Sequence, residues 1–207
     1  MPRVVVVGLG PGDDSLVTTA TLAEIARVPV RFLRTERHPS AHLVPGATTF
    51  DRVYDAAPSF EDVYRTIADE LVAAAVGHGE VLYAVPGSPL ILERTVAHLR
   101  ARDDVETIVH PAISFLDDTW RALGIDPVET GVRLVDGHDF ARAAAGETGP
   151  MLVAHTHANW VLSDIKLSID DPDPDTPVVL VHHVGLRDER IVPTTWSEMD
   201  RTLEADH

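Results

Sequence analysis

The feature that most constrains the fold is a run of four valines, Val4 to Val7, followed at once by the glycine-rich sequence GLGPGDD. A strand whose consecutive residues are all apolar must be buried on both faces, which is typical of a parallel sheet covered by helices. The glycines lack a Cβ and Pro11 fixes one φ angle, so the turn is stiff and its backbone is accessible. In open α/β sheets, ligands bind at the carboxyl ends of the strands. The segment therefore predicts a buried strand followed either by a ligand-binding turn or by an ordinary tight turn into a helix.

The spacing within this turn does not match the common nucleotide-binding loops. The third glycine comes one position too early for the dinucleotide fingerprint, and Asp13 and Asp14 would repel phosphate. The first lysine of the chain is Lys166, so no Walker lysine follows the turn. A ligand with a neutral or positively charged head group fits better. We expect Asp13, Asp14 and Ser15 to cap the next helix rather than to contact a ligand.

The composition excludes several classes of protein. The 207 residues are 44% hydrophobic, which is enough for one large core or two small ones. No apolar run approaches the roughly 20 residues of a membrane helix, and we expect no signal peptide because the sequence MPRVVVV reads directly into a strand. The absence of cysteine excludes disulfides, thiolate catalysis and cysteine-bound metals, and a formal charge of −16 disfavours nucleic acid. We therefore expect a cytoplasmic protein with no membrane or nucleic-acid partner.

Short apolar runs alternate with helix-like stretches along the chain, a pattern that predicts an α/β protein with two domains, residues 1–111 and 112–207. The amino-terminal domain is expected to hold a mostly parallel sheet. The carboxyl-terminal domain is expected to hold a mixed sheet because its strands are shorter and closer together. Strands are expected near 4–7, 30–33, 81–85, 107–109, 132–135, 151–154, 178–182 and 190–192. Helices are expected near 15–26, 60–76, 90–101, 114–123, 159–168 and 195–203.

Three further turns follow predicted strands as the first one does. They have the sequences PGSP, beginning at Pro86, HPAIS, beginning at His110, and THAN, beginning at Thr156. If both domains direct these turns at one cleft, backbone amides and carbonyls could hold a flat, largely uncharged ligand. Their shared position after buried strands is stronger evidence for a site than any one turn alone.

The order of these motifs resembles the tetrapyrrole methylase family. GLGPGD is followed by RTERHP at 34–39, YAVPGSPLILERTV at 83–96, HPAISFLDD at 110–118 and SDIKLSI at 163–169. More narrowly, the sequence is similar to the methylase-like amino-terminal domain that is fused to MazG-type nucleoside triphosphate pyrophosphohydrolases. The resemblance implies two α/β domains, S-adenosylmethionine (SAM) held in the cleft between them, and a homodimer.

The resemblance also implies which residues bind the cofactor. They are Pro11, Gly87, Ser88, Pro89, Ile91, Ser114 and Phe115 in the first part of the chain, and Thr156, His183 and Val184 in the second. Two residues depart from the family pattern, since Ser88 replaces an aspartate and Ala112 replaces a glycine. Ser88 keeps the turn but removes a charge, and Ala112 requires a negative φ unless its backbone is strained. The family's arginine-bearing and acidic motifs for a macrocyclic substrate are not evident here.

Three functions are compatible with these observations. The first is a SAM-dependent methyltransferase with an unknown small-molecule acceptor. The second is a non-catalytic SAM-fold regulatory module associated with a MazG-type nucleotide pyrophosphohydrolase. The third is a structural dimerisation domain. Methyl transfer from a sulfonium needs a well-placed nucleophile more than an acid and a base, so no catalytic residue is assigned. The acidic pairs at 61–62 and 69–70 lack the paired spacing of a pyrophosphohydrolase and are expected to form a charged outer face.

Four histidines, His155, His157, His182 and His183, lie at the ends of predicted strands. One of them could serve as a base, or all of them are ordinary polar residues. Two strands could also supply imidazoles to a zinc ion. However, adjacent histidines point to opposite faces of a strand and no third ligand is clear, so no metal site is expected.

Two other groups of residues have simple interpretations. Arg34, Arg37 and His38 form a small basic cluster that either faces an acid or lies in a solvated loop. Trp120 and Trp160 lie within helix patterns and are expected in the core.

Overall fold

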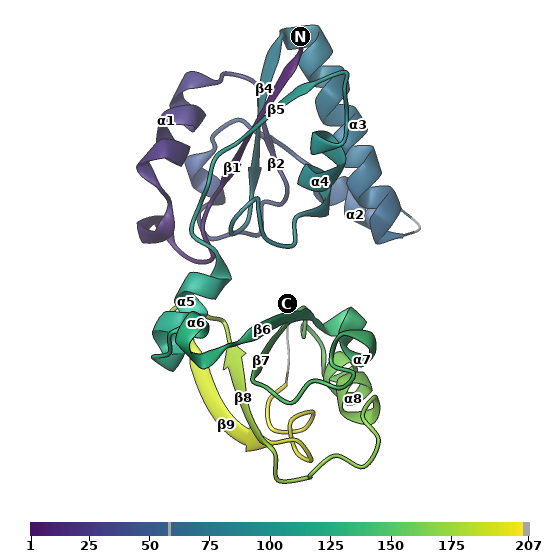
Figure 1. The fold of residues 1–207 in the computed structure, drawn as a ribbon. Helices are drawn as coiled ribbons and strands as arrows, with labels where there is room; N and C mark the ends of the chain where they lie inside the picture. The colour runs from purple at the N-terminus through teal and green to yellow at the C-terminus, as the bar shows by residue number, and fades with distance from the viewer. Residues whose placement is uncertain (58, 205–207) are drawn as a thin grey trace. The chain divides into compact units, whose positions relative to one another are not determined.

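The computed structural model describes residues 1–57 and 59–204 and divides into two compact units, Met1–Asp118 and Thr119–His207. Each unit combines strands and helices, in agreement with the predicted α/β class (Figure 1). The division predicted between residues 111 and 112 lies between the last strand of the first unit and the helix that follows it. That division stays a prediction.

The first unit is built on a five-stranded sheet in which every pairing is parallel, as predicted. The strand order is β3-β2-β4-β1-β5. The strands are β1 (Arg3–Gly8), β2 (Arg31–Leu33), β3 (Thr48–Thr49), β4 (Glu80–Val85) and β5 (Glu106–Val109). The short strand β3 was not predicted. The valine run thus lies in β1, between two parallel neighbours, where a strand is buried on both faces.

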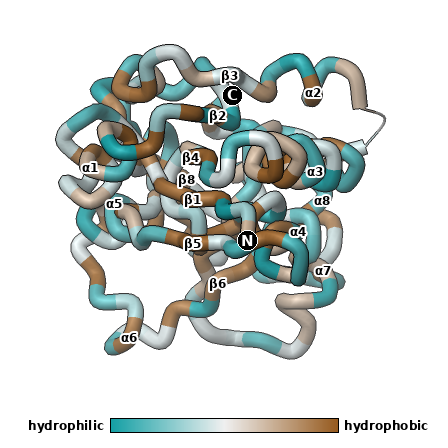
Figure 2. Tube along the Cα trace, turned by 90° about the horizontal axis from the view of Figure 1, so that it is seen from above, coloured by the Kyte–Doolittle hydropathy of each residue, from teal (hydrophilic) through white to brown (hydrophobic). Residues whose placement is uncertain are grey.

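Helices cover both faces of this sheet. They are α1 (Thr19–Arg27), α2 (Asp51–Ala56), α3 (Phe60–His78) and α4 (Arg94–Arg100). The same unit holds the 3₁₀ turns η1 (Asp14–Leu16) and η2 (Ala41–Leu43). The next helix, α5 (Phe115–Leu123), contains the boundary between the two units. Figure 1 shows α3 and α4 on one face and α1 on the other. Val4 and Val6 pack in the core on the α3 side, whereas Val5 and Val7 pack on the α1 side. After Arg3, strand β1 is accordingly hydrophobic, and brown segments of the tube lie beside its label in Figure 2.

Two predicted helices begin later than expected. Asp13 caps the turn η1 through its Oδ1, which accepts a hydrogen bond from the Ser15 backbone N–H at 2.9 Å. Thr18 then caps α1, so the predicted capping role of Asp13 is confirmed for a 3₁₀ turn rather than for the helix itself. The helix α4 begins at Arg94 because Leu92 has a left-handed backbone, with φ at 56°, which cannot continue into a helix.

The outer face of α3 is charged, as predicted. Glu61 lies 3.1 Å from His98, and Asp69 lies 2.5 Å from Arg102. Asp62 and Glu70 also form ion pairs with arginines. Within the residues that the structure describes, no helix combines the length and apolar character needed to cross a membrane.

The second unit contains shorter elements. They are α6 (Pro127–Thr130), β6 (Arg133–Asp136), η3 (Gly137–Asp139), α7 (Phe140–Ala143), β7 (Met151–Ala154), α8 (Asn159–Leu167), β8 (Pro177–His182) and β9 (Arg190–Thr195). The pair β6 and β7 is parallel, and the pair β8 and β9 is antiparallel. Both strand directions occur, as expected, but in two separate two-stranded sheets rather than in one mixed sheet.

The prediction of a helix near 195–203 is wrong. Strand β9 extends to Thr195, and hydrogen-bonded turns follow it. Side-chain donors from α8 bind backbone carbonyl oxygens of these turns. Asn159 donates to the carbonyls of residues 200 and 203, and Lys166 donates to that of residue 197. Contacts from a distant part of the sequence therefore override the local helix pattern.

Candidate functional site

Three turns converge at the carboxyl ends of β1, β4 and β5. The three strands are adjacent and parallel, with Gly8 opposite Val85 and Val6 opposite Val109. The chain segments that leave them, 9–13, 86–92 and 110–114, therefore emerge at one edge of the sheet. This is the edge at which open α/β sheets bind ligands.

The first and second turns are joined directly through their backbones. Gly87 N–H donates to the carbonyl of Gly10 at 2.8 Å, and Gly10 N–H donates to the carbonyl of Gly87 at 3.2 Å. These reciprocal bonds form an isolated antiparallel bridge between two segments that lie far apart in the sequence. The two turns consequently form one rigid backbone frame.

Gly8 lies where the three turns pack most closely against one another. A Cβ at this position would lie 2.2 Å from the Gly87 carbonyl oxygen, 2.6 Å from the Ala112 Cβ and 2.8 Å from the Pro89 Cδ. No side chain larger than hydrogen fits there without moving backbone. Ala112 is not among the residues with a left-handed φ, so its replacement of the family's glycine causes no backbone strain.

The turn between β4 and α4 combines a constrained backbone with open space. Gly87 has a φ of 63°, and no heavy atom outside its own neighbours lies within 4 Å of where its Cβ would be. Leu92 adopts a left-handed φ in the same turn, a conformation that costs about 1–3 kcal/mol in a residue with a side chain. Strained residues of this kind cluster at ligand-binding turns.

The segment after β2 supports the first turn through His38. The His38 Nδ1 accepts a hydrogen bond from the Ser40 N–H at 3.2 Å, so the ring proton is on Nε2, which donates to the Gly10 carbonyl at 2.9 Å. Burial, opposed by the Gly10 carbonyl, lowers the pKa of His38 below its usual value. The neutral ring is therefore part of the native hydrogen-bond network.

This arrangement predicts a pH-dependent stability. Because the pKa of His38 is lower in the folded chain than the 6.5 of an unperturbed histidine, the unfolded chain binds more protons. The contribution of His38 is fully present above pH 6.5 and decreases as the pH falls towards the folded-state pKa. We expect the free energy of unfolding, measured in urea, to fall more between pH 7.5 and 5.5 in the wild type than in His38→Gln. Equal falls in the two proteins would contradict this.

Arg34 belongs to a buried ion pair rather than to a solvated loop. Its guanidinium pairs with Glu93, whose side chain is 2% exposed, and its Nε donates to the Tyr54 hydroxyl at 2.7 Å. Burial opposes its charge, but Glu93 and Tyr54 together raise the pKa of Arg34 above its ordinary value. Since Glu93 also caps α4, this pair ties the end of β2 to the residue that ends the Gly87 turn.

The other predicted cofactor residues of the first unit lie on these turns. The Ser88 hydroxyl is buried and accepts a hydrogen bond from the Leu90 N–H at 3.4 Å. Ser114 begins the last segment, and both its N–H and its hydroxyl donate to Asp117, at 2.8 and 2.9 Å. Pro11, Ile91 and Phe115 are partly buried. Their contacts with a cofactor stay predictions.

The predicted residues of the second unit lie at the ends of β7 and β8. Thr156 follows β7 and is partly buried. His183 has a left-handed φ of 50°, and its Nδ1 lies 2.6 Å from an Asp188 carboxylate oxygen. Val184 follows in the same partly buried turn, and the Gly185 N–H donates to Glu189 at 2.9 Å. The cofactor-binding role of these residues stays a prediction.

The four histidines at strand ends fall into two groups in the second unit. His182 and His183 stack with ring centroids 3.7 Å apart. His155 and His157 instead lie beside His138, at 5.9 and 5.5 Å between ring centroids. The sequence interpretation missed His138 and its neighbour Asp136, although the letters DGH directly after a strand repeat the pattern of a polar turn at a strand end.

Trp160 is not in the core. It is 57% exposed, and its ring lies 6.2 Å from that of His138. Trp120, by contrast, is partly buried. Trp160 does lie in a helix, α8, as predicted, but the prediction that it is buried is wrong. The buried face of α8 is formed by Val161, Leu162 and Ile165.

The amino-acid sequence matches a protein family and one relative from Bacillus subtilis. Residues 3–200 match the sequence profile of the family described as Tetrapyrrole (Corrin/Porphyrin) Methylases. A relative from Bacillus subtilis (strain 168), the uncharacterized protein YabN, is 32% identical over 209 residues. The match covers 97% of this chain and 42% of the relative, so the chain spans about two fifths of that protein's length.

Solved structures share the fold. The uroporphyrin-III C-methyl transferase from Thermus thermophilus, complexed with S-adenyl homocysteine, has a TM-score of 0.68 at 21% identity. That similarity covers 99% of this chain and 94% of the other. A cobalamin biosynthetic enzyme, cobalt precorrin-4 methyltransferase, has a TM-score of 0.65 at 19% identity, covering 96% of this chain and 87% of the other. At these identities the likeness shows the fold.

Proposed function

The chain belongs to the tetrapyrrole methylase family, and from this premise we propose that it binds SAM and transfers the methyl group to a small-molecule acceptor. The observation that carries the proposal is the convergence of three rigid turns around Gly8, at the carboxyl edge of the parallel sheet. Membership of the family is the reason to expect SAM as the cofactor, and the three turns are where we propose that it binds.

The turn at Gly87 fits a cofactor that is held by main-chain groups. The space beside Gly87 is open, whereas its backbone is fixed by the two hydrogen bonds to Gly10. A ligand could therefore approach the backbone closely without displacing a side chain. The positive sulfonium of SAM also suits a chain with a formal charge of −16 better than a phosphate would.

SAM would supply an activated methyl group, so the protein's part is to bind and orient. We assign binding in the first unit to the residues of the three turns, namely Pro11, Gly87, Ser88, Pro89, Ile91, Ser114 and Phe115. In the second unit we assign it to Thr156, His183 and Val184. The hydrogen bonds of His38 and the buried pair of Arg34 with Glu93 keep the turns in place. Such positioning accounts for much of the rate of a transfer reaction.

Calorimetric titration of the pure chain with SAM, with its demethylated product S-adenosylhomocysteine, and with ATP tests the proposal. We expect saturable binding of the first two ligands and none of ATP, because the glycine-rich turn lacks a phosphate-binding lysine and carries two aspartates. A folded protein that binds neither SAM nor its product would overturn the proposed function.

A second candidate is a regulatory SAM-binding module that accompanies a nucleotide pyrophosphohydrolase of the MazG type. The relative from Bacillus subtilis has more than half of its length outside the match, which supports a fusion to a further domain. Ser88, in place of the family's aspartate, also favours binding without turnover. Methyl transfer from labelled SAM to uroporphyrin-III or related macrocycles would favour the enzyme, whereas binding without transfer would favour the module.

The assembly and location of the protein complete the proposal. We propose that it forms a homodimer and works in the cytoplasm, which the absence of cysteine supports. Sedimentation equilibrium at several protein concentrations tests the dimer. A single species with the mass of one chain at every concentration would contradict it.

A further inference from the structure

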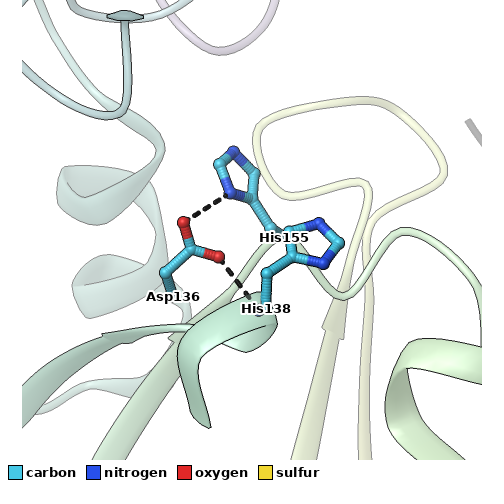
Figure 3. A group of neighbouring side chains, drawn as sticks. All are labelled: Asp136, His138 and His155. Carbon is cyan, nitrogen blue, oxygen red and sulfur yellow. Dashed lines mark hydrogen bonds and ion pairs between the residues drawn. The ribbon is translucent and has the colours of Figure 1, made fainter. Parts of the chain in front are cut away.

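Asp136, His138 and His155 converge at one edge of the second unit. Strands β6 and β7 are parallel, with Asp136 opposite Ala154, so the residues that end both strands lie at the same edge. One potential ligand atom from each of the three side chains lies within 4.8 Å of the other two. Figure 3 shows the carboxylate facing the ring of His155, with His138 on the turn beside them.

The backbone is shaped to bring these side chains together. A Cβ at Gly137 would lie 2.9 Å from the Ala154 carbonyl oxygen, so the absence of a side chain lets η3 approach the end of β7. His155, directly after β7, has a left-handed φ of 60°. That conformation is costly for a residue with a side chain, and strain of this kind is typical of functional positions.

The carboxylate of Asp136 is held in a fixed orientation. Its Oδ1 accepts the backbone N–H of His138 at 3.1 Å, which leaves Oδ2 directed at the His155 Nδ1, 3.2 Å away. A hydrogen bond that orients a ligating carboxylate is a regular feature of metal sites. Tetrahedral zinc, with bonds of roughly 2.0–2.2 Å, places its ligand atoms about 3.4 Å apart, close to the 3.2 Å between Asp136 Oδ2 and His155 Nδ1. The potential ligand atom of His138 lies within 4.8 Å of the other two.

We propose that Asp136, His138 and His155 bind a divalent transition-metal ion of the zinc type. Two imidazole nitrogens and one carboxylate oxygen suit such an ion, whereas calcium and magnesium prefer oxygen ligands alone. When the His155 Nδ1 binds the ion, the neutral ring carries its proton on Nε2, so the hydrogen bond to Asp136 is exchanged for two metal bonds. His138 and His155 are exposed, which leaves the remaining coordination positions accessible to water or to another ligand.

The proposal is independent of SAM binding and is tested with the metal alone. Zinc is titrated calorimetrically into the full chain without a polyhistidine tag. We expect one ion per chain and a raised thermal midpoint, because an ion that binds only the folded protein stabilises it. Replacing one ligand should weaken binding at least as much as losing an orienting contact, which costs about 10–100-fold.

Three variants and one control locate the ion. His138→Ala and His155→Ala each remove an imidazole. Asp136→Asn keeps an oxygen to accept the His138 N–H but removes the ligating charge, so it tests the ligand without removing the cap. His42→Ala is the matched control, because His42 forms another exposed His–Asp pair, with Asp14 at 3.0 Å.

We expect zinc affinity to fall in the three variants and to persist in His42→Ala. No stoichiometric binding to the wild type would overturn the proposal. Binding that is unchanged in both Asp136→Asn and His155→Ala, or that is lost equally in His42→Ala, would overturn it as well. If His138→Ala fails to fold, the other two variants decide the result.

Discussion

Replacing Gly8 with alanine is expected to lower the free energy of unfolding by about 3 kcal/mol or more, at or above the upper end of the usual cost of overpacking. The added methyl group would lie 2.2 Å from the Gly87 carbonyl oxygen, which is backbone and is fixed by the bridge to Gly10. Neither the turn nor β1 can shift without breaking hydrogen bonds. Urea unfolding, followed by circular dichroism, measures the change.

Gly77→Ala is the matched control for this single methyl group. Gly77 lies near the end of α3, where a Cβ would meet no atom within 4 Å. Alanine favours a helix over glycine by up to about 1 kcal/mol, so this variant should be more stable than the wild type. The same chemical change is thus expected to have opposite signs at the two sites. Similar unfolding midpoints for Gly8→Ala and the wild type would contradict the steric argument.

Replacing Gly87 with valine is expected to abolish SAM binding while the chain stays folded. The new side chain would project into the open space beside the turn, where the proposed function places the cofactor. The left-handed backbone adds a strain of about 1–3 kcal/mol, which a folded domain usually tolerates. Calorimetry should show a fall in affinity of at least 100-fold, equivalent to about 2.7 kcal/mol.

Gly79→Val separates the loss of binding from backbone strain. Gly79 directly precedes β4, has a φ of 83° and is surrounded by open space, so valine there has the same kind of conformational cost. It lies at the opposite end of β4 from the turn at Gly87. We expect both variants to lose stability but only Gly87→Val to lose SAM binding. Unchanged affinity in a folded Gly87→Val would show that the cofactor does not contact this turn.

The architecture of the first unit could be predicted because its signals are local and mutually consistent. A continuous valine run requires burial on both faces, and the glycine and proline turns mark where the strands end. The contacts of Arg34 and His38 could not be predicted in this way. Their partners, Glu93 and Gly10, lie far away in the sequence, and only the folded sheet brings them together.

The second unit was harder to predict for a related reason. Its strands form two small sheets. The turns after β9 are held by side chains that lie far away in the sequence, since Asn159 and Lys166 donate to their backbone carbonyls. The group of Asp136, His138 and His155 depends on the parallel register of β6 and β7, which the sequence does not reveal. Of the four histidines considered in the sequence, only His155 belongs to this group, and the other two side chains come from the end of β6 and the turn that follows it.

The close approach at Gly8 also determines how β1 aligns with its neighbours. Its four valines have identical shapes and both faces of the sheet are apolar, so burial alone would accept a strand that had slipped by one residue. A slipped strand would place Val7 or Leu9 beneath the Gly87 carbonyl, where no side chain fits. Gly8 therefore selects one register of β1 from several that would bury a similar apolar surface.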